Sequence, residues 1–356
     1  MNRTFSPDCR SLLIGSFPVT DHEEAGRLVM TYSPEIPVWA QLPSYRIEGM
    51  IPQFLPGLPG VCEENGKSFV HTENKAFEEG LVSFYEQYLE VSEGLGNIDA
   101  SIFALNPEVA KGFFVLLKNL EGLKTPPFAV KGQVTGPITF CTGVTDQNKK
   151  AIFYNDQLRD AAVKLLSLKA VWQIKQLGAF QAPVIIFIDE PAMTGFGSSE
   201  FTTISREDVS ACLEEVISAI HEAGGLAGIH VCGNTDWSLL LESSVDIINF
   251  DAYAYFDRFV LYGDHVRKYL NTGGVLAWGI VPTLLAEDID RETSDSLARN
   301  LRGRMEQLGA LGIEKQRIYN QSLITPSCGT GSLSVERAQK VLSMTREISN
   351  ALRNPI

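Results

Sequence analysis

The sequence predicts an α/β protein in which eight parallel strands close into a (β/α)8 barrel, also called a TIM barrel. Short runs rich in Val and Ile alternate with longer amphipathic stretches along the chain, and there are eight such runs. This alternation predicts parallel strands joined by crossovers. Eight strands in 356 residues fit a closed barrel better than an open sheet. No run is followed by the Gly-x-Gly-x-x-Gly fingerprint of dinucleotide-binding sheets, which disfavours the open alternative.

The predicted strands cover Ser11–Gly15, Ile36–Trp39, Phe128–Gln133, Val184–Ile188, Gly228–Val231, Asp246–Phe250, Val275–Trp278 and Arg317–Leu323. In the stretches between them, apolar residues recur at helical spacing, with charges on the other face. These predicted helices include Asn74–Val91, Tyr154–Leu177, Arg206–Ala223, Asp257–Leu270, Arg291–Leu308 and Ser334–Ala351. The stretch Leu42–Lys67 contains Pro and Gly throughout, so we interpret it as a long loop. No low-complexity linker divides the chain, and residues 1–356 are interpreted as one catalytic domain.

The composition indicates a cytoplasmic protein that acts on small molecules. A formal net charge of −13 disfavours a nucleic-acid partner, whose phosphates most of this surface would repel. No apolar run reaches the roughly 18 residues that a membrane helix needs. The segment Met1–Arg10 lacks the apolar stretch of a signal peptide. The six cysteines are scattered, which in a reducing compartment indicates buried, catalytic or metal-bound thiols.

Polar or metal-binding side chains follow five of the predicted strands at their carboxyl ends. They are Ser16, Asp189 with Glu190, His230 with Cys232, Asp251, and Cys328. In a parallel barrel these ends share one face, and that face carries the active site. Packing alone does not account for five such positions.

His230, Cys232 and Cys328 form a candidate zinc site. Residues i and i+2 share a face as a strand ends, so His230 and Cys232 can turn toward one point, and barrel closure can bring Cys328 to it. Zinc prefers imidazole and thiolate ligands, and three protein ligands with one open position are typical of a catalytic site. A thiol that enters the open position loses its proton and becomes a nucleophile. The spacing alone is also compatible with cysteines that only pack in the core.

At these residues the chain resembles the superfamily of cobalamin-independent methionine synthases, methylcobalamin:coenzyme M methyltransferases and uroporphyrinogen decarboxylase. Five segments match in order along the chain. Leu13–Thr20 is similar to the family's segment that contacts the amino-acid substrate, and Val134–Thr139 contains its TGP turn. Ile188–Ala192 has the family's IDEPA sequence, and His230–Asn234 has the H-x-C-G-N form of the coenzyme M enzymes. Pro326–Gly329 resembles the segment that carries the last zinc cysteine.

The resemblance implies zinc as cofactor and a role for each matching residue. Asp189 and Glu190 are the candidate catalytic residues: the family's Asp at the position of Asp189 contacts the substrate amino group, and Glu190 is expected to make a supporting hydrogen bond, or the two residues exchange these roles. The family's fourth zinc ligand is a Glu, and the matching residue here is Asp251. Asp251 can ligate zinc, or it can serve as a cap or ion-pair partner at the strand end.

Two departures from the family bear on the substrates. Methionine synthases of this type carry an extra N-terminal barrel that helps to hold folate, and this chain has room for the catalytic barrel only. The resemblance therefore implies another methyl donor, such as a methylated corrinoid (methylcobalamin) that is free or bound to a partner corrinoid protein. The second carboxylate that meets the homocysteine amino group is expected near Gln41–Ser44, which supplies none, although Glu48 is close by.

Two further residues are candidates for substrate binding. The backbone N–H of Ser16, in a glycine-containing turn, can hold a carboxylate, or Ser16 can simply cap the next helix. Trp278 ends a strand, where it can stack on a flat ligand or fill the mouth of the barrel.

The function expected from these residues is a zinc-dependent methyltransferase, methionine synthase-like, that moves a methyl group to a small-molecule thiol. One alternative is a decarboxylase of the uroporphyrinogen type, which needs no metal but uses a basic cleft. The other is a corrinoid-binding protein without turnover.

Overall fold

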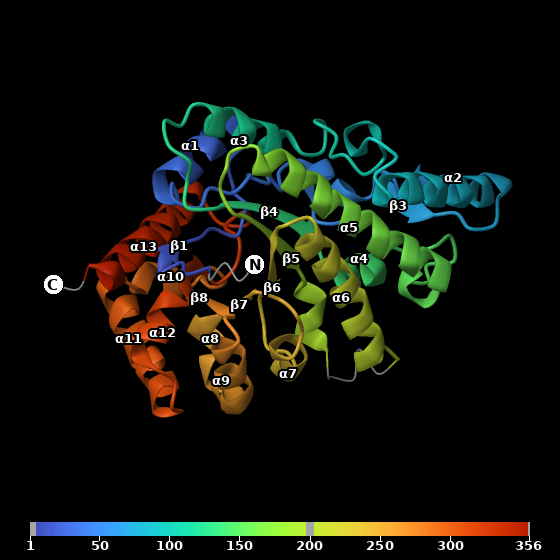
Figure 1. Ribbon diagram of the computed structural model, residues 1–356. Coiled ribbons are helices and arrows are strands. Elements are labelled where there is room, and N and C mark those ends of the chain that lie inside the picture. Colours follow the sequence, from blue (N-terminus) through green and yellow to red (C-terminus); the bar gives the residue numbers. More distant parts are fainter. Residues whose placement is uncertain (1–4, 197–202, 355–356) are drawn as a thin grey trace.

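Seven parallel strands form one curled sheet in the computed structural model, which describes residues 5–196 and 203–354 (Figure 1). The strand order is β1-β9-β8-β7-β6-β5-β4. The strands are β1 (Arg10–Ser11), β4 (Val130–Thr135), β5 (Val184–Asp189), β6 (Leu226–Val231), β7 (Ile247–Phe250), β8 (Val275–Val281) and β9 (Ser322–Pro326). Each strand from β4 to β9 therefore pairs with its neighbour in sequence, as in the predicted barrel.

Residues 35–41 connect the two edges of this sheet. Val38 pairs in parallel with Lys131 of β4, and Gln41 pairs in parallel with Ser16, just beyond β1. Backbone hydrogen bonds accompany both pairs. The eight segments therefore follow one another around the barrel in sequence order, and the predicted α/β barrel class is confirmed.

At least one helix follows each of the eight segments and covers the outside of the sheet (Figure 1). These helices are α1 (His22–Tyr32), α3 (Lys111–Glu121), α4 (Pro137–Gly143), α5 (Asp156–Gly178), α6 (Arg206–Glu222), α7 (Trp237–Leu241), α8 (Ala252–Phe259), α9 (Gly263–Asn271), α10 (Ala286–Arg291), α11 (Ser294–Ala310), α12 (Lys315–Asn320) and α13 (Val335–Arg353). Several begin at a polar residue whose side chain accepts a hydrogen bond from a free backbone N–H of the first turn. Asp21, Asn155 and Ser334 cap α1, α5 and α13 in this way.

Several predicted boundaries differ from the structure. The predicted helix Asp257–Leu270 is split into α8, a short 3-10 turn over Val260–Tyr262 and α9. The predicted strand Arg317–Leu323 starts later, because its first residues complete α12. The predicted loop Leu42–Lys67 contains two 3-10 turns, Arg46–Glu48 and Pro52–Phe54, and β2 (Val61–Glu64), which pairs with β3 (Lys67–Val70). After this hairpin, α2 (Lys75–Ser92) extends beyond the barrel (Figure 1).

Two apolar layers form the core. The inner layer fills the barrel with alternate residues of the strands: Leu12, Ile36, Ala129, Ile185, Phe187, Ile247, Val275, Ala277 and Leu323. The outer layer, which consists of one large cluster and a smaller one beside α1, packs the other face of the strands against the helices. Side chains in register with the inner layer therefore point into the barrel. Within the described residues, no helix is long and apolar enough to cross a bilayer.

Candidate metal centre

His230, Cys232 and Cys328 meet at the carboxyl end of the barrel. His230 is the second-last residue of β6, Cys232 follows β6 directly, and Cys328 lies two residues after β9. One ligand atom from each residue lies within 4.8 Å of the other two. The structure thus brings together the three residues that strand-end position had singled out, although 96 residues separate the two cysteines (328 − 232).

Hydrogen bonding and burial determine the state of the His230 ring. Its Nδ1 contacts Oδ1 of Asn249, the residue opposite it on β7. Its Nε2 is buried and has no hydrogen-bond partner among the described residues. Burial lowers the pKa of His230 to about 4, outweighing the opposing effect of the bond to Asn249. The ring is therefore neutral at pH 7, and a neutral imidazole nitrogen is the form that binds metals.

The two cysteine thiols differ in acidity because they contact each other. A hydrogen bond from Cys328 lowers the pKa of Cys232 to about 7, and the Thr194 hydroxyl adds to this effect against the opposing influence of burial. The same hydrogen bond and burial raise the pKa of Cys328 above its usual range. Cys232 is thus the more acidic thiol of the pair, and its sulfur accepts the hydrogen bond from the Cys328 thiol.

This donor set fits zinc. One neutral imidazole nitrogen and two sulfur atoms are ligands that zinc prefers. A buried polar atom without a partner costs free energy, so the free Nε2 of His230 itself indicates a missing ligand. The carboxylate of Asp251 does not belong to the group of three. Three protein ligands leave room for an exchangeable fourth, as in catalytic zinc sites.

Asp189, the last residue of β5, is in register with His230 of β6. It is buried, and its Oδ1 has no partner among residues 5–196 and 203–354. Burial raises the pKa of Asp189 to about 6, against the effect of the positive charge of Lys131. Asp189 thus offers a free acceptor beside the candidate metal ligands.

Lys131 lies near the site and is not among the residues expected from the sequence. It is fully buried on β4 and lies inside the barrel, 4.6 Å from the ring centroid of the inner-layer residue Phe187. Its Nζ donates to the carbonyl of Ile14 at 2.6 Å and to Oε1 of Gln133 at 3.2 Å. Burial lowers the pKa of Lys131 to about 8, partly offset by the negative charge of Asp189. A charged residue in the middle of the predicted strand Phe128–Gln133 is the signal that could have identified it.

Glu190 holds the start of α4 rather than facing an open site. Its Oε1 accepts from the N–H of Ile138 at 2.8 Å, and its Oε2 accepts from the N–H and the hydroxyl of Thr139 at 2.8 and 2.6 Å. Its side chain is fully buried, and burial raises its pKa to about 7 despite these donors. Glu190 therefore makes the expected hydrogen bonds, and their donors belong to a helix N-terminus.

Ser16 packs against the loop that carries Cys328. Its carbonyl accepts from the N–H and the hydroxyl of Thr330 at 3.0 and 2.9 Å, and its hydroxyl accepts from the N–H of Gly331 at 3.3 Å. The cap of the following helix is Asp21, so Ser16 is not that cap. Ser16 thus lies beside the candidate metal centre, where a substrate-binding role stays a prediction.

Asp251 caps α8. Its Oδ1 accepts from the N–H of Ala254 at 2.8 Å, and burial raises its pKa to about 6. The structure therefore shows the second of the two roles that the sequence left open, and the carboxylate lies outside the group of three ligands.

The prediction that Trp278 contacts a ligand is wrong. Trp278 is fully buried, its Nε1 donates to the hydroxyl of Ser322 at 2.9 Å, and its ring packs 5.5 Å from that of Phe250. Its neighbour Ala277 belongs to the inner layer. Because successive side chains of a strand point to opposite faces, Trp278 points outward, toward the helices.

Glu48 is not free to bind a substrate amino group. It is buried, its Oε1 lies 2.6 Å from Nε2 of His22, and its Oε2 accepts from the N–H of Leu42 at 2.9 Å. These contacts fasten the loop after residues 35–41 to α1. Gln41–Ser44 contains no carboxylate that could take this role instead.

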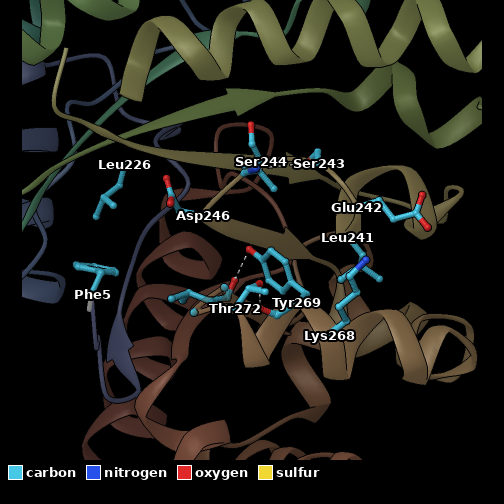
Figure 2. Close-up of a pocket in the computed structure, with 14 residues that line it drawn as sticks. Phe5, Leu226, Leu241, Glu242, Ser243, Ser244, Asp246, Lys268, Tyr269 and Thr272 are labelled. Atoms are coloured by element: carbon cyan, nitrogen blue, oxygen red, sulfur yellow. Dashed lines mark hydrogen bonds between the residues drawn. The ribbon is translucent and has the colours of Figure 1, made fainter. Parts of the chain in front are cut away.

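A pocket of about 400 Å³ lies at the opposite end of the barrel (Figure 2). It is lined by Leu226 and Val275, the first residues of β6 and β8, and by Asp246, which precedes β7. The Asp246 carboxylate accepts from the N–H of Ala227 at 2.7 Å and lies 2.8 Å from Nε2 of His221. Its hydrogen bonds therefore stabilise the strand ends, and nothing at this pocket resembles the donor set of the metal centre.

Comparison with known proteins shows the fold and nothing more specific. No protein-family model matches the sequence, and no curated protein matches it. The structure is similar to that of a candidate vitamin-B12-independent methionine synthase from Listeria monocytogenes, with a TM-score of 0.53 and 12% identity over 96% of this chain and 98% of that chain. A GH20 module of a pneumococcal exo-β-D-N-acetylglucosaminidase matches less well, with a TM-score of 0.41 and 12% identity over 98% of this chain and 87% of that chain.

Proposed function

We propose that this protein is a zinc-dependent methyltransferase that moves a methyl group to a small-molecule thiol. The observation that carries the proposal is the convergence of His230, Cys232 and Cys328, whose ligand atoms lie within 4.8 Å of one another. The group lies at the carboxyl ends of barrel strands, where the active sites of this architecture lie. The similar Listeria structure, which is named as a candidate methionine synthase, supports the same chemistry.

Each residue of the site has a role in this proposal. A zinc ion held by the three residues would supply the positive charge that keeps a substrate thiol deprotonated at neutral pH. The substrate thiolate attacks the methyl carbon of the donor, so that a sulfur–carbon bond forms and the donor leaves with the electron pair of the broken bond. His230 is neutral at pH 7, so its unprotonated ring nitrogen can bind a metal ion without first releasing a proton.

Asp189 and Ser16 are proposed to orient the acceptor. The free Oδ1 of Asp189 can accept a hydrogen bond from a positively charged group such as an amine. Ser16 lies beside the Cys328 loop, and its backbone N–H can donate a hydrogen bond to a carboxylate. An amino-acid thiol carries both groups, and homocysteine is therefore the first acceptor to test.

The methyl donor is proposed to be a methylated corrinoid, either free methylcobalamin or a partner corrinoid protein. The H-x-C-G-N sequence at His230–Asn234 supports it through its likeness to the coenzyme M enzymes. The Listeria protein is named as independent of vitamin B12, so a methylated folate belongs in the same panel of donors.

Metal analysis of the purified protein tests the first part of the proposal. We expect about one zinc per chain in the unaltered protein and none in the double variant Cys232→Ser/Cys328→Ser. Cys62→Ser, which changes a partly exposed cysteine of the β2–β3 hairpin, is the matched control and should retain zinc. An unaltered protein without zinc, or a double variant with a full complement, contradicts the proposal.

An assay of methyl transfer tests the second part. Each donor is combined with homocysteine, coenzyme M and other thiols, and the methylated thiol is measured. Demethylation of methylcobalamin only when a thiol and zinc are both present is the expected result. Binding of methylcobalamin without demethylation would instead favour a corrinoid-binding protein, and release of carbon dioxide from a porphyrinogen carboxylate would favour a decarboxylase.

A further inference from the structure

We infer that Asn249 is a positioning residue of the metal centre, which fixes the His230 ring in one tautomer and one orientation. Asn249 lies on β7 opposite His230, and its side chain is fully buried inside the barrel. Its amide oxygen contacts His230, and its amide nitrogen contacts Ala277 and Thr325. The inference rests on the proposed function only for the identity of the metal.

The surroundings of Asn249 determine which way its amide points. Its Nδ2 donates to the carbonyl of Ala277 at 2.8 Å and to the hydroxyl of Thr325 at 2.8 Å. A backbone carbonyl can only accept a hydrogen bond, so the amide nitrogen must face Ala277. A flipped amide would place two acceptor oxygens against each other inside the barrel. The amide oxygen therefore faces His230.

This orientation of Asn249 in turn selects the tautomer of His230. The amide oxygen is an acceptor, so Nδ1 of His230 must carry the proton that it shares with Asn249. A neutral imidazole has one ring proton, and Nε2 therefore keeps a free lone pair. That nitrogen is the buried atom without a partner. Histidine ligands of metals are commonly oriented by such a bond at the other ring nitrogen.

Asn249 also connects the strands that carry the ligands. Thr325 is the second-last residue of β9, three positions before Cys328. Through its amide, Asn249 links β6, which carries His230, to β9, which leads to Cys328. All three amide positions, two N–H groups and one oxygen, are used. A change at Asn249 is therefore expected to loosen the histidine and to alter its position relative to the thiols.

The tautomer can be measured without any metal. In metal-free protein labelled with nitrogen-15 histidine, we expect the His230 signal to show a protonated Nδ1 and a bare Nε2. His230→Gln identifies the signal by removing it. A protonated Nε2 overturns the inference whether or not the protein binds zinc, so this result is independent of the proposed function.

Metal affinity and geometry test the positioning role. In Asn249→Leu, which keeps the approximate size but cannot hydrogen-bond, we expect the zinc affinity measured against a chromophoric chelator to fall about 10- to 100-fold. The visible spectrum of the cobalt(II)-substituted protein should change shape. Gln321→Leu is the matched control, because the Gln321 amide donates to the carbonyls of Leu270 and Gly274 at 2.9 and 2.6 Å just before β9 begins, at the other end of that strand from the Cys328 loop. It should lower the stability of the fold and leave the zinc affinity and the cobalt spectrum unchanged.

Thr325→Val is a milder variant that removes only one partner of the Asn249 amide and keeps the side-chain shape. We expect a smaller loss of affinity than in Asn249→Leu, about threefold to tenfold. If Asn249→Leu does not fold, this variant and the tautomer measurement decide. An unaltered zinc affinity and cobalt spectrum in both variants overturns the positioning role. If the unaltered protein binds neither zinc nor cobalt(II), the proposed function is contradicted. The tautomer measurement, which needs no metal, then tests the inference about Asn249 by itself.

Discussion

Seven buried side-chain atoms have no hydrogen-bond partner among the described residues, and two of them belong to His230 and Asp189 at the candidate site. These two atoms are Nε2 of His230 and Oδ1 of Asp189. Leaving such an atom unpaired costs about 1–3 kcal/mol. The neighbouring carboxylates of Glu190 and Asp251 both accept hydrogen bonds from helix N-termini. His230 and Asp189 therefore each have an atom free to bind a ligand, whereas Glu190 and Asp251 hold the backbone around the site.

The role of Asp251 can be tested by two substitutions. Asp251→Asn retains a side-chain oxygen that can cap α8, whereas Asp251→Ala removes it. Because loss of a cap costs about 1 kcal/mol, we expect only the Ala variant to lower the free energy of unfolding measured with denaturant. Both variants should keep their zinc. A zinc-to-protein ratio that falls in both variants would instead make Asp251 the fourth ligand that the family resemblance implies.

Individual site residues could be predicted only where position along a strand was informative. The three ligands lie at or just after the carboxyl ends of strands, and the sequence places them there directly. Lys131 and Asn249 lie inside the barrel, and their importance depends on partners from other strands, such as Ile14 and Thr325. The error at Trp278 has two causes: β8 continues three residues beyond it to Val281, and only the pairing register shows which face of the sheet its side chain occupies.

At the scale of elements, Glu190 ties two neighbouring strand ends together. It follows β5, and its carboxylate receives three hydrogen bonds from Ile138 and Thr139 in the first turn of α4, which follows β4. The backbone carbonyl of Asp189 also accepts from the N–H of Gly136 at 2.8 Å. Asp189 is therefore held in place by the same contacts that fix the start of α4.

Glu190→Gln should weaken this contact without removing any ligand of the metal centre. One acceptor oxygen becomes an amide that faces hydrogen-bond donors, so we expect the free energy of unfolding to fall by about 2 kcal/mol. Zinc content should stay at the level of the unaltered protein. Glu90→Gln on the exposed face of α2 makes the same chemical change and should stay within about 0.5 kcal/mol. Loss of methyl transfer with no change in stability would contradict a scaffolding role and favour direct contact with substrate.

Element type was easier to predict than element length. Periodic stretches such as Tyr154–Leu177 became helices close to their predicted ends, because an Asn155 cap marks the start. The apolar residues near Ile318 were assigned to a strand, but they form the buried side of the short helix α12. Short apolar runs fit either element, and only tertiary packing decides between them.

At the scale of the whole molecule, the barrel depends on residues 35–41. This segment bridges β4 on one side and the residues after β1 on the other, although each contact is an isolated bridge. The sequence indicated the eight segments and their order, since alternation with helices leaves few topologies. The sequence could not indicate that residues 35–41 would be held largely by packing against α3, because this packing depends on how closely α3 approaches the segment.

Gly112 in the first turn of α3 permits that approach, and substituting it tests how the barrel is closed. A Cβ atom added to Gly112 would lie 1.8 Å from the backbone carbonyl oxygen of Ala40. Either α3 or the segment 35–41 must then move, and overpacking of this kind costs about 1–3 kcal/mol. We expect Gly112→Ala to lower the free energy of unfolding by that amount and to reduce zinc affinity, because the displaced segment pairs with Ser16 beside the Cys328 loop.

The matched control is Gly303→Ala within α11, where an added Cβ atom meets no atom within 4 Å. Alanine loses less conformational freedom than glycine in a helix, so this variant should be more stable by about 0.5–1 kcal/mol. Denaturant unfolding and zinc competition on both variants give the comparison. If Gly112→Ala has the same free energy of unfolding as Gly303→Ala, the segment 35–41 can move without loss of stability. Its packing against α3 then does not close the barrel. If only the Gly112 variant loses stability and zinc together, closure of the barrel and assembly of the metal centre depend on the same contact.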